Sequence, residues 1–387
     1  MSTPTPWPEA RRTAYELGLS IDLPTVELPL DRAVGHTLAA APASANPLPA
    51  FDTVAMDGYA VRGEGPAWDL LDYDQLAGHR AAELPDGRAV RIATGAQLPP
   101  KTEGIVRLED STVTEGTVSG PHQRDWRETG DEIALGEELL PAGTPVSPAA
   151  AGFAAAAGLD RLTVFEKPTA AFAVFGDELI DRGPARDGKI RDSLGPMLPA
   201  MLEGLGATAS RPVHVEDTPE AHYNALNGPA PQPTILCTTG GTMHGPVDYL
   251  HPTLKKLGAE YLIDTVAVRP GFPMLLARTP NGIVCGLPGN PQSAVISVAT
   301  IVAPLIAGLL RRPLPELGVA AVADDIPGRG DCHRLALVDD FGRLIPHHGS
   351  AMLRGVATAR GFAVVEPHTN ARRSDALPLV PMPGRTS

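Results

Sequence analysis

Three short glycine-containing loops, each placed directly after an apolar, β-branched run, constrain the fold of this chain most. The loops are residues 175–178 (FGDE), 238–242 (TTGGT) and 286–291 (GLPGNP), and the runs before them are 170–174, 234–237 and 282–285. In an open α/β sheet, the carboxyl ends of parallel strands bring such loops to one edge, where ligands bind. Glycines let backbone N–H groups approach a phosphate, and a helix N-terminus behind them adds partial positive charge. The sequence therefore predicts a phosphate-binding edge on a parallel sheet.

Carboxylates accompany this predicted edge. Glu178 ends the first loop, Asp217 follows the run 212–215, and Asp248 lies shortly after the second loop. A carboxylate beside a phosphate is best explained by a divalent cation between them, and Mg²⁺ prefers oxygen ligands. Each of these carboxylates also fits a plainer interpretation, as a helix cap or a solvated acid in a first helical turn. We expect a Mg²⁺-dependent enzyme or binding protein for a phosphorylated, nucleotide-like ligand.

The loop residues have a binding interpretation and a structural one. In TTGGT, Gly240 and Gly241 bring backbone amides to a phosphate, or they form an ordinary strand–helix turn. In GLPGNP, Pro288 stiffens the backbone and Asn290 is suited to cap the helix that follows. We favour ligand contact for both loops. The candidate ligand-contacting residues are Thr239, Gly240, Gly241, Pro288, Gly289 and Asn290.

Three further polar residues are candidates. Arg269 ends another predicted strand, and a guanidinium offers paired donors to a tetrahedral oxyanion. Asp57 and Thr94 lie in turns between apolar residues, and neither is diagnostic alone. No Ser/His/Asp arrangement or Cys/His pair supports covalent catalysis.

Composition limits the class of protein. A chain of 387 residues predicts two to four domains. The net charge of −13 disfavours binding to nucleic acid, which needs a basic face. Cys237 and Cys285 lie in apolar strand runs and are expected to be buried, inert thiols.

We expect a cytoplasmic protein without membrane association. The N-terminal residues contain no apolar stretch of the kind found in a signal peptide. The longest apolar run, 294–310, contains Ser297, Thr300 and Pro304. We interpret this run as too short and too interrupted to span a bilayer.

The spacing of apolar residues changes along the chain and predicts a multidomain α/β plus β fold. Residues 1–45 and 146–167 are expected to form a helical domain, with helices at 8–17 and 31–41, and 46–145 an inserted β domain. Residues 168–312 alternate strand and helix patterns, which predicts a doubly wound α/β domain. Residues 313–387 return to a β pattern.

Two helices of the predicted α/β domain have clear boundaries. The helix at 192–206 carries leucines and methionines on one face, Asp192 or Ser193 is suited to its N-cap, and Gly206 to its end. A second, long helix is expected at 291–310.

Eight segments of the chain, taken in order, match the pattern of a known family. They are 49–62 (PAFDTVAMDGYAVR), 93–99 (ATGAQLP), 130–146 (GDEIALGEELLPAGTPV), 176–179 (GDEL), 238–248 (TTGGTMHGPVD), 269–273 (RPGFP), 286–291 (GLPGNP) and 349–350 (GS). In this combination the chain resembles the MoeA family of molybdopterin molybdenumtransferases, which includes the E domain of gephyrin. The resemblance covers essentially the whole chain, and the combination is far more specific than any single segment.

The resemblance implies a fold, an assembly and a reaction. The fold has an elongated helical domain, an inserted β domain, a central molybdopterin-binding α/β domain and a C-terminal β-barrel-like domain. Members are homodimers, whose site lies between the α/β and C-terminal domains of one subunit and the inserted domain of the other. The reaction converts adenylylated molybdopterin and molybdate, with Mg²⁺, into molybdenum cofactor and AMP.

The resemblance also assigns residues to three groups. They are Asp57 and Thr94, reaching in from the partner subunit; Glu178, Asp217 and Asp248, holding Mg²⁺ and the phosphates; and Arg269, Arg334 and Ser350, near the molybdate. Because the reaction is a displacement at phosphorus, the protein mainly positions groups and neutralises charge. Asp57, Thr94, Glu178 and Asp248 are the residues expected to act in catalysis.

The chain departs from the usual family residues near the expected molybdate site. Residues 243–245 (MHG) stand where members read Ser-Val-Gly, Phe272 stands where a lysine is usual, and a lysine expected near Thr265 is missing. Two alternatives to the transferase therefore stay open. One is a paralogue that binds molybdopterin or molybdenum cofactor with weakened or no transferase activity. The other is a nucleotide-dependent enzyme with a different substrate on the same scaffold.

Overall fold

The computed structural model describes residues 3–228, 232–243, 248–346 and 349–384. The chain divides into two compact units. The first, here called the sheet unit, comprises Met1–Val26, Gly35–Ala39 and Val164–Ser387, and the second, the inserted unit, comprises Glu27–Val34 and Ala40–Thr163. The expected combination of an α/β sheet with further β sheets is confirmed. The four domain boundaries drawn from the sequence stay predictions.

A seven-stranded sheet forms the centre of the sheet unit, in the order β16-β13-β18-β22-β21-β19, with β17 also pairing with β13. The strands are β13 (Thr169–Phe175), β16 (Thr208–Ala209), β17 (Val213–Val215), β18 (Ile235–Thr239), β19 (Glu260–Ile263), β21 (Leu275–Thr279) and β22 (Gly282–Leu287). The neighbours β13, β18 and β22 run parallel, whereas β21 and β19 are antiparallel. The three glycine loops therefore follow adjacent parallel strands, as predicted.

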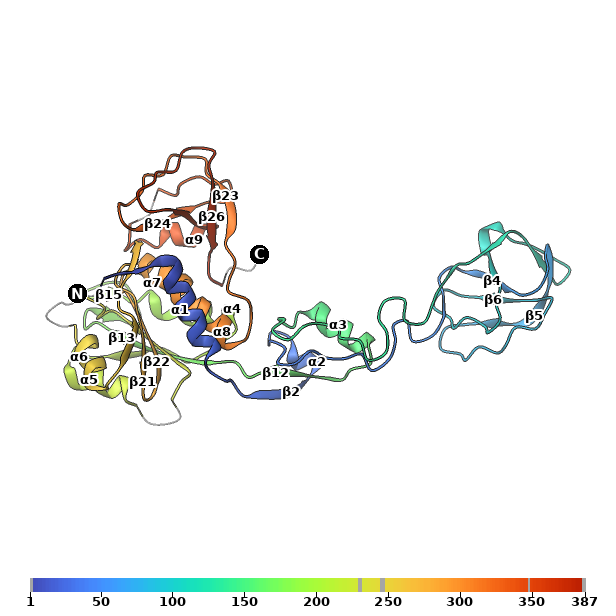
Figure 1. The fold of residues 1–387 in the computed structure, drawn as a ribbon, viewed down its shortest axis with the longest axis horizontal. Coiled ribbons are helices and arrows are strands. Elements are labelled where there is room, and N and C mark those ends of the chain that lie inside the picture. The colour runs from blue at the N-terminus through green and yellow to red at the C-terminus, as the bar shows by residue number, and fades with distance from the viewer. Residues whose placement is uncertain (1–2, 229–231, 244–247, 347–348, 385–387) are drawn as a thin grey trace. The chain divides into compact units, whose positions relative to one another are not determined.

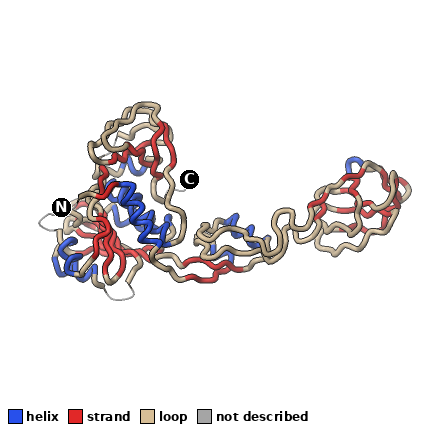
Figure 2. Tube along the Cα trace, viewed as in Figure 1, coloured by secondary structure: helices blue, strands red, loops and turns tan. Residues whose placement is uncertain are grey.

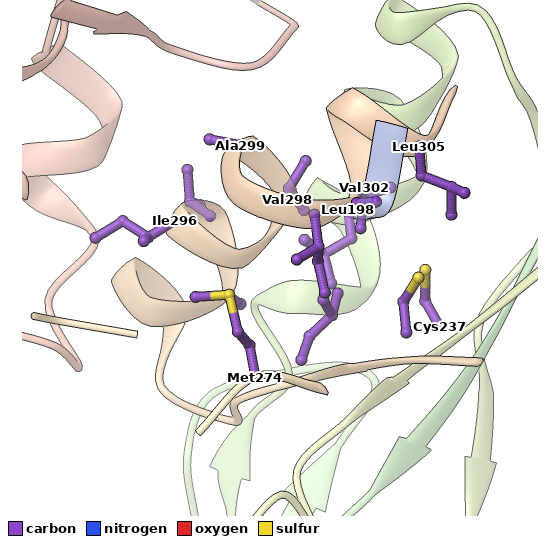
Figure 3. Packing of buried hydrophobic residues seen from close by; sticks show 14 of the residues in the cluster. Leu198, Cys237, Met274, Ile296, Val298, Ala299, Val302 and Leu305 are labelled. Atoms are coloured by element: carbon purple, nitrogen blue, oxygen red, sulfur yellow. The ribbon is translucent and has the colours of Figure 1, made fainter. Parts of the chain in front are cut away.

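Alternating side chains of this sheet face two helical layers. In β13, Ala170 and Phe172 pack with α4 (Leu194–Leu205) on one face, and Ala173 and Phe175 pack with α5 (Pro219–Leu226) and α6 (Leu250–Lys256) on the other. Figure 3 shows part of the first layer, with Leu198 of α4 near Val302. Helices on both faces confirm the doubly wound arrangement (Figure 1).

Helix α4 begins and ends as the sequence predicts. The Asp192 carboxylate accepts hydrogen bonds from the amides of Leu194 and Gly195, both at 2.9 Å, while Ser193 makes no side-chain capping bond. Gly206 ends the helix with a φ of 104°, a conformation that costs glycine little.

A continuous helical segment runs through the core of the sheet unit. It comprises α7 (Pro291–Ser297), the π-helical stretch η2 (Val298–Val302) and α8 (Ala303–Leu309). By length and composition alone this segment is apolar enough to cross a membrane, with a mean hydropathy of 1.8, so the expectation that it is too short is wrong. Every residue of that apolar window is buried within the protein, which accounts for its composition.

Two cysteines lie inside this core. Cys237 and Cys285 are register partners on β18 and β22, and both are free and buried. Hydrogen bonding with Cys237, followed by burial, raises the pKa of the Cys285 thiol. Both observations agree with the prediction of inert thiols.

A six-stranded sheet forms the rest of the sheet unit, in the order β1-β20-β24-β25-β26-β23. Its strands are β1 (Thr5–Pro6), β20 (Val266–Arg269), β23 (Gly318–Ala321), β24 (His333–Val338), β25 (Gly361–Val365) and β26 (Ala376–Pro381). Strand β20 pairs with β24 although it lies within the stretch predicted as the α/β domain. Helices α1 (Trp7–Leu19) and α9 (Arg354–Thr358) also belong to this unit, as does the two-stranded pair β14 (Leu179–Ile180) and β15 (Ile190–Arg191).

The inserted unit is built mainly from short strands and loops (Figure 2). Its larger sheet has the order β10-β7-β4-β6-β5-β9-β8. The strands are β4 (Gly58–Val61), β5 (Ala67–Gln75), β6 (Arg88–Ile92), β7 (Gly104–Arg107), β8 (Thr112–Thr114), β9 (Thr117–Ser119) and β10 (His122–Gln123), with the 3₁₀ turn η1 (Leu108–Asp110). A smaller pair in this unit is β3 (Thr53–Val54) with β11 (Trp126–Arg127). A further pair is β2 (Thr25–Pro29) with β12 (Arg161–Phe165), and each of these two strands has residues in both units.

The prediction of a helix over residues 31–41 is wrong. Helix α3 (Pro148–Ala156) lies within the stretch 146–167 that was expected to belong to the helical domain, but residues 31–41 hold only the end of the four-residue α2 (Leu30–Ala33). Val34, which follows α2, has extended backbone angles, and Gly35 has a φ of 83°. A glycine in this conformation ends the helical path that the apolar spacing had suggested.

Candidate functional site

A cavity of about 970 Å³ in the sheet unit brings together five of the predicted ligand-binding residues. It is lined by Arg269 of β20, Arg334 of β24, Ser350, and Pro288 and Asn290 of the loop before α7. The cavity thus lies where the loop at the end of β22 meets the second sheet of the same unit. Arg329 also lines it, and sequence reasoning had missed this residue.

Strand pairing places two of the arginines side by side. Arg269 and Arg334 are register partners on the parallel strands β20 and β24. Arg334 is buried, and its guanidinium donates to the carbonyl of Pro327 at 2.5 Å. Burial, followed by the charge of Arg329, lowers the pKa of Arg334. Because an arginine stays charged even with a lowered pKa, the cavity holds concentrated positive charge suited to an oxyanion.

Phe272 occupies the place where resemblance predicted a lysine, and it lies against Arg269. The Arg269 guanidinium carbon is 4.3 Å from the centre of the Phe272 ring, and both residues line the cavity. This distance is within the range of a cation–π interaction. The ring therefore contacts Arg269, whereas a lysine at this position would add a second cation to the cavity. His244, the other notable departure from the family pattern, lies outside the described residues.

The loop before α7 contacts both the cavity and the neighbouring glycine loop. The amide of Gln292, in the first turn of α7, donates to the carbonyl of Ser350 at 2.9 Å, which joins this helix end to the segment carrying Ser350. Asn290 occupies the N-cap position but makes no side-chain capping bond, so that part of the prediction is wrong. Asn290 nevertheless lines the cavity.

Gly240 and Gly241 form a turn that only glycine adopts easily, with φ values of 84° and 66°. The amide of Gly240 donates to the carbonyl of Leu287 at 3.0 Å, and a Cβ placed on Gly289 would lie 3.7 Å from the Cα of Gly240. The two loops are therefore adjacent, as the sequence predicted. Thr239, in contrast, is the last residue of β18 and is only 2% exposed.

The predicted metal-binding carboxylates lie along the same carboxyl edge. The Asp177 amide donates to Asp217 Oδ2 at 3.1 Å, and the Asp217 amide donates to Asp177 Oδ1 at 3.3 Å. The Glu178 carboxylate lies over Gly176, where a Cβ would come within 2.7 Å of Glu178 Oε2. Within the described residues, no group of three or more His, Cys, Asp or Glu side chains is arranged to hold a metal ion. Glu178, Asp217 and Asp248 therefore form no preassembled metal cage.

A buried histidine that the sequence did not single out lies behind these carboxylates. His222 of α5 is 0% exposed, and its ring stacks on Phe175 with centroids 3.7 Å apart. Its Nε2 lies 3.6 Å from Asp217 Oδ1. Burial lowers the pKa of His222, although the carboxylates of Asp217, Asp248 and Asp177 act in the opposite direction. Asp248 is thus electrostatically coupled to the same ring as Asp217.

The remaining predicted residues meet each other in the inserted unit. The backbone amide and the hydroxyl of Thr94 donate to Asp57 Oδ1 at 2.6 and 2.8 Å. These bonds, the backbone one first, lower the pKa of Asp57, which is exposed. The pair therefore presents an ionised carboxylate to solvent. Two turns that were undiagnostic in the sequence are joined into a single polar feature.

Two residues with a place in the site gave little signal in the sequence. Arg329 lies in the segment 327–330 (PGRG), shortly before Arg334 but outside every segment that carried the family resemblance. His222 has the spacing of an ordinary core residue of a helix. Tertiary contacts bring Arg329 into the cavity and His222 next to Asp217, and these contacts have no local sequence signal.

Two family models match the chain along most of its length. The one described as MoeA N-terminal region (domain I and II) matches residues 5–158. The one described as probable molybdopterin binding domain matches residues 171–308. The second match contains the three glycine loops and the carboxylates Glu178, Asp217 and Asp248.

Curated relatives and solved structures agree with these matches. The chain is 28% identical over 357 residues to the molybdopterin molybdenumtransferase of Staphylococcus aureus (strain MRSA252), covering 89% of this chain and 82% of the relative. It is 29% identical over 359 residues to that of Bacillus subtilis (strain 168), covering 88% and 81%. The crystal structure of a molybdopterin biosynthesis MoeA protein from Pyrococcus horikosii has a TM-score of 0.81 and 22% identity, covering 98% of this chain and 99% of the other.

Proposed function

This chain belongs to the MoeA family, and from that premise we propose that it is a molybdopterin molybdenumtransferase of molybdenum cofactor biosynthesis. In this role it inserts molybdate into adenylylated molybdopterin and releases AMP. The observation that carries the proposal is the cavity in which Arg269, Arg334 and Ser350 meet the 286–291 loop. That cavity offers cations to an oxyanion beside backbone amides suited to a phosphate.

The proposed division of labour follows the chemistry of the two substrates. Molybdate is a tetrahedral dianion, and the arginine side of the cavity supplies charge-assisted donors for it. The pterin phosphates are assigned to the turns at Gly240, Gly241 and Gly289, where the lack of side chains lets an anion approach the backbone closely. The Gly240 amide itself donates to the Leu287 carbonyl, so Gly241 and Gly289 are the proposed N–H donors. The residues that do this work position the reactants and offset negative charge.

Mg²⁺ is part of this proposal. The candidate ligands Glu178, Asp217 and Asp248 carry hard oxygen donors at the carboxyl edge of the central sheet. Mg²⁺ is usually bound by one or two carboxylates plus substrate phosphates, so a preassembled three-carboxylate cage is not required. The donor set therefore fits the ion. When bound, Mg²⁺ offsets charge on the pyrophosphate and so helps AMP to leave.

We also propose a cytoplasmic homodimer in which Asp57 and Thr94 act on substrate bound to the partner subunit. The hydrogen bonds from Thr94 keep the Asp57 carboxylate ionised and fixed in orientation. A fixed, exposed carboxylate outside the sheet unit supports a role at a site completed by a second copy.

The test is incubation of the pure protein with adenylylated molybdopterin, Mg²⁺ and molybdate while AMP is followed. The transferase predicts AMP release that depends on both molybdate and Mg²⁺. AMP release that ignores molybdate would contradict the proposal.

The second candidate is a paralogue that binds molybdopterin or the cofactor with weakened or no transferase activity. Phe272 favours it, because an aromatic ring replaces a cation beside the proposed oxyanion site. Tight binding of the pterin without AMP release would identify this paralogue. Binding of neither pterin nor molybdate would indicate the remaining alternative, a nucleotide-dependent enzyme with a different substrate.

A further inference from the structure

We infer that His222 is a positioning residue that holds the Asp217 carboxylate in its ligand-binding orientation. This inference rests on the proposed function, because Asp217 is assigned to the metal side of that site. Nothing in the family resemblance pointed to His222, and the residue contributes no atom to the cavity surface. Its proposed action is entirely through Asp217.

The geometry holds the Asp217 carboxylate from two sides. On one side the Asp177 amide donates to Oδ2 at 3.1 Å. On the other, His222 Nε2 lies 3.6 Å from Oδ1. That distance is just beyond a hydrogen bond, so a small rotation of the carboxylate completes the contact. With both contacts made, the plane of the carboxylate is fixed.

The His222 ring itself has little freedom. It stacks on Phe175, the last residue of β13, with an interplanar angle of 16°, and Tyr249 meets it edge-on at 5.5 Å. Phe175 directly precedes the Gly176 turn, and Tyr249 directly follows Asp248. The ring is therefore clamped between the two segments that carry the other candidate metal ligands.

Packing alone does not explain a histidine at this position. Neither ring nitrogen has a hydrogen-bond partner among the described residues, and both are buried. A buried polar group without a partner destabilises the folded state, whereas a phenylalanine would stack equally well without that cost. Asp217 Oδ1 lies 3.6 Å from Nε2 of this ring. A donor aimed at a ligand's second oxygen is the arrangement by which outer residues orient metal-binding side chains.

The experiment uses the full-length protein and three variants. His222→Phe keeps the stacking and removes the donor, while His222→Gln places an amide nitrogen near the position of Nε2. His251→Phe is the matched control, because His251 of α6 also stacks on an aromatic ring, that of Tyr261, but lies outside the proposed site. Thermal denaturation of each variant establishes that it is folded.

The first readout is Mn²⁺ binding, followed by the loss of the free-ion electron paramagnetic resonance signal, with Mn²⁺ replacing Mg²⁺. We expect His222→Phe to weaken binding by about tenfold or more, as is typical for loss of a residue that orients a metal ligand. His222→Gln should stay close to wild type, and His251→Phe should be unchanged. In the AMP-release assay, His222→Phe should raise the half-saturating Mg²⁺ concentration more than it lowers the rate at saturation.

Two failures can be told apart by including Asp217→Ala. If wild type binds Mn²⁺ no better than Asp217→Ala, the metal role proposed for this edge fails, and the positioning role fails with it. If Asp217→Ala weakens binding but His222→Phe does not, only the inference about His222 is overturned. A His222→Gln variant as weak as His222→Phe would also overturn it, because the restored donor would then have no effect.

Discussion

Asp177 and Asp217 are joined reciprocally, because the backbone amide of each donates to the carboxylate of the other. The two bonds link the carboxyl ends of the parallel strands β13 and β17. They also hold two negative charges close together on an edge that sequence reasoning assigned to an anionic ligand. Such an arrangement is unfavourable for the anion unless a cation lies between them, which supports the proposed Mg²⁺.

Two substitutions of Asp177 distinguish the role of its negative charge from the role of its hydrogen bond with the Asp217 amide. Asp177→Asn keeps an oxygen that accepts from the Asp217 amide, whereas Asp177→Ala removes it. If Asp177 positions Asp217, the alanine variant should lose about tenfold in turnover and the asparagine variant much less. Because both groups are near the surface, the free energy of unfolding should change by less than about 1 kcal/mol. Equal losses of turnover in AMP-release assays would assign the role to the charge instead.

Asp248 is the sharper test of the metal side. Asp248→Asn preserves shape but removes a negative charge, and losing one electrostatic stabiliser typically lowers the rate by about 10²–10³-fold. We expect Mg²⁺-dependent AMP release to fall by that amount while size-exclusion chromatography shows an unchanged assembly. Unchanged turnover would remove Asp248 from the site.

The carboxyl edge could be predicted from the sequence because its determinants are local. A buried parallel strand followed by glycines is visible in a few consecutive residues, and the order of β13, β18 and β22 then brings their loops together. The same reasoning placed the α4 boundaries correctly, since Asp192 and Gly206 act within one helical turn.

The remaining features depend on pairings between distant segments. The sequence spacing assigned β20 to the α/β domain, but it pairs with β24, and this pairing is what places Arg269 beside Arg334. Arg329 reaches the same cavity from a segment that carries no local signal. The helix predicted over 31–41 does not form, because Gly35 adopts a φ of 83° that a helix cannot continue through, whatever the spacing of the apolar residues around it.

Phe272 offers a direct test of the oxyanion side. Phe272→Lys adds a cation to the cavity, and a charge-assisted contact is worth about 1.5–3 kcal/mol, so the half-saturating molybdate concentration should fall by about tenfold or more. Phe272→Leu is the control, because it removes the aromatic ring from Arg269 without adding a charge. The cation–π contact that it removes is worth about 0.5–2 kcal/mol. This variant should raise the half-saturating concentration. No change in either variant would mean that the Phe272 side chain does not face the anion.

His222 also predicts how the stability of the fold changes with pH. In the unfolded chain it titrates near its ordinary pKa of 6.5, whereas burial lowers the pKa of the folded residue. As the pH falls below about 6.5, the unfolded chain therefore takes up a proton that the folded chain does not, and acid favours unfolding until the folded pKa is reached. His222→Phe removes this proton uptake. In urea denaturation, the free energy of unfolding of His222→Phe minus that of wild type should therefore increase from pH 7.5 to pH 5.5. This range spans about one unit on either side of the ordinary histidine pKa. A constant difference between wild type and His222→Phe over this range would contradict the prediction, because it would mean that folding does not change the pKa of His222.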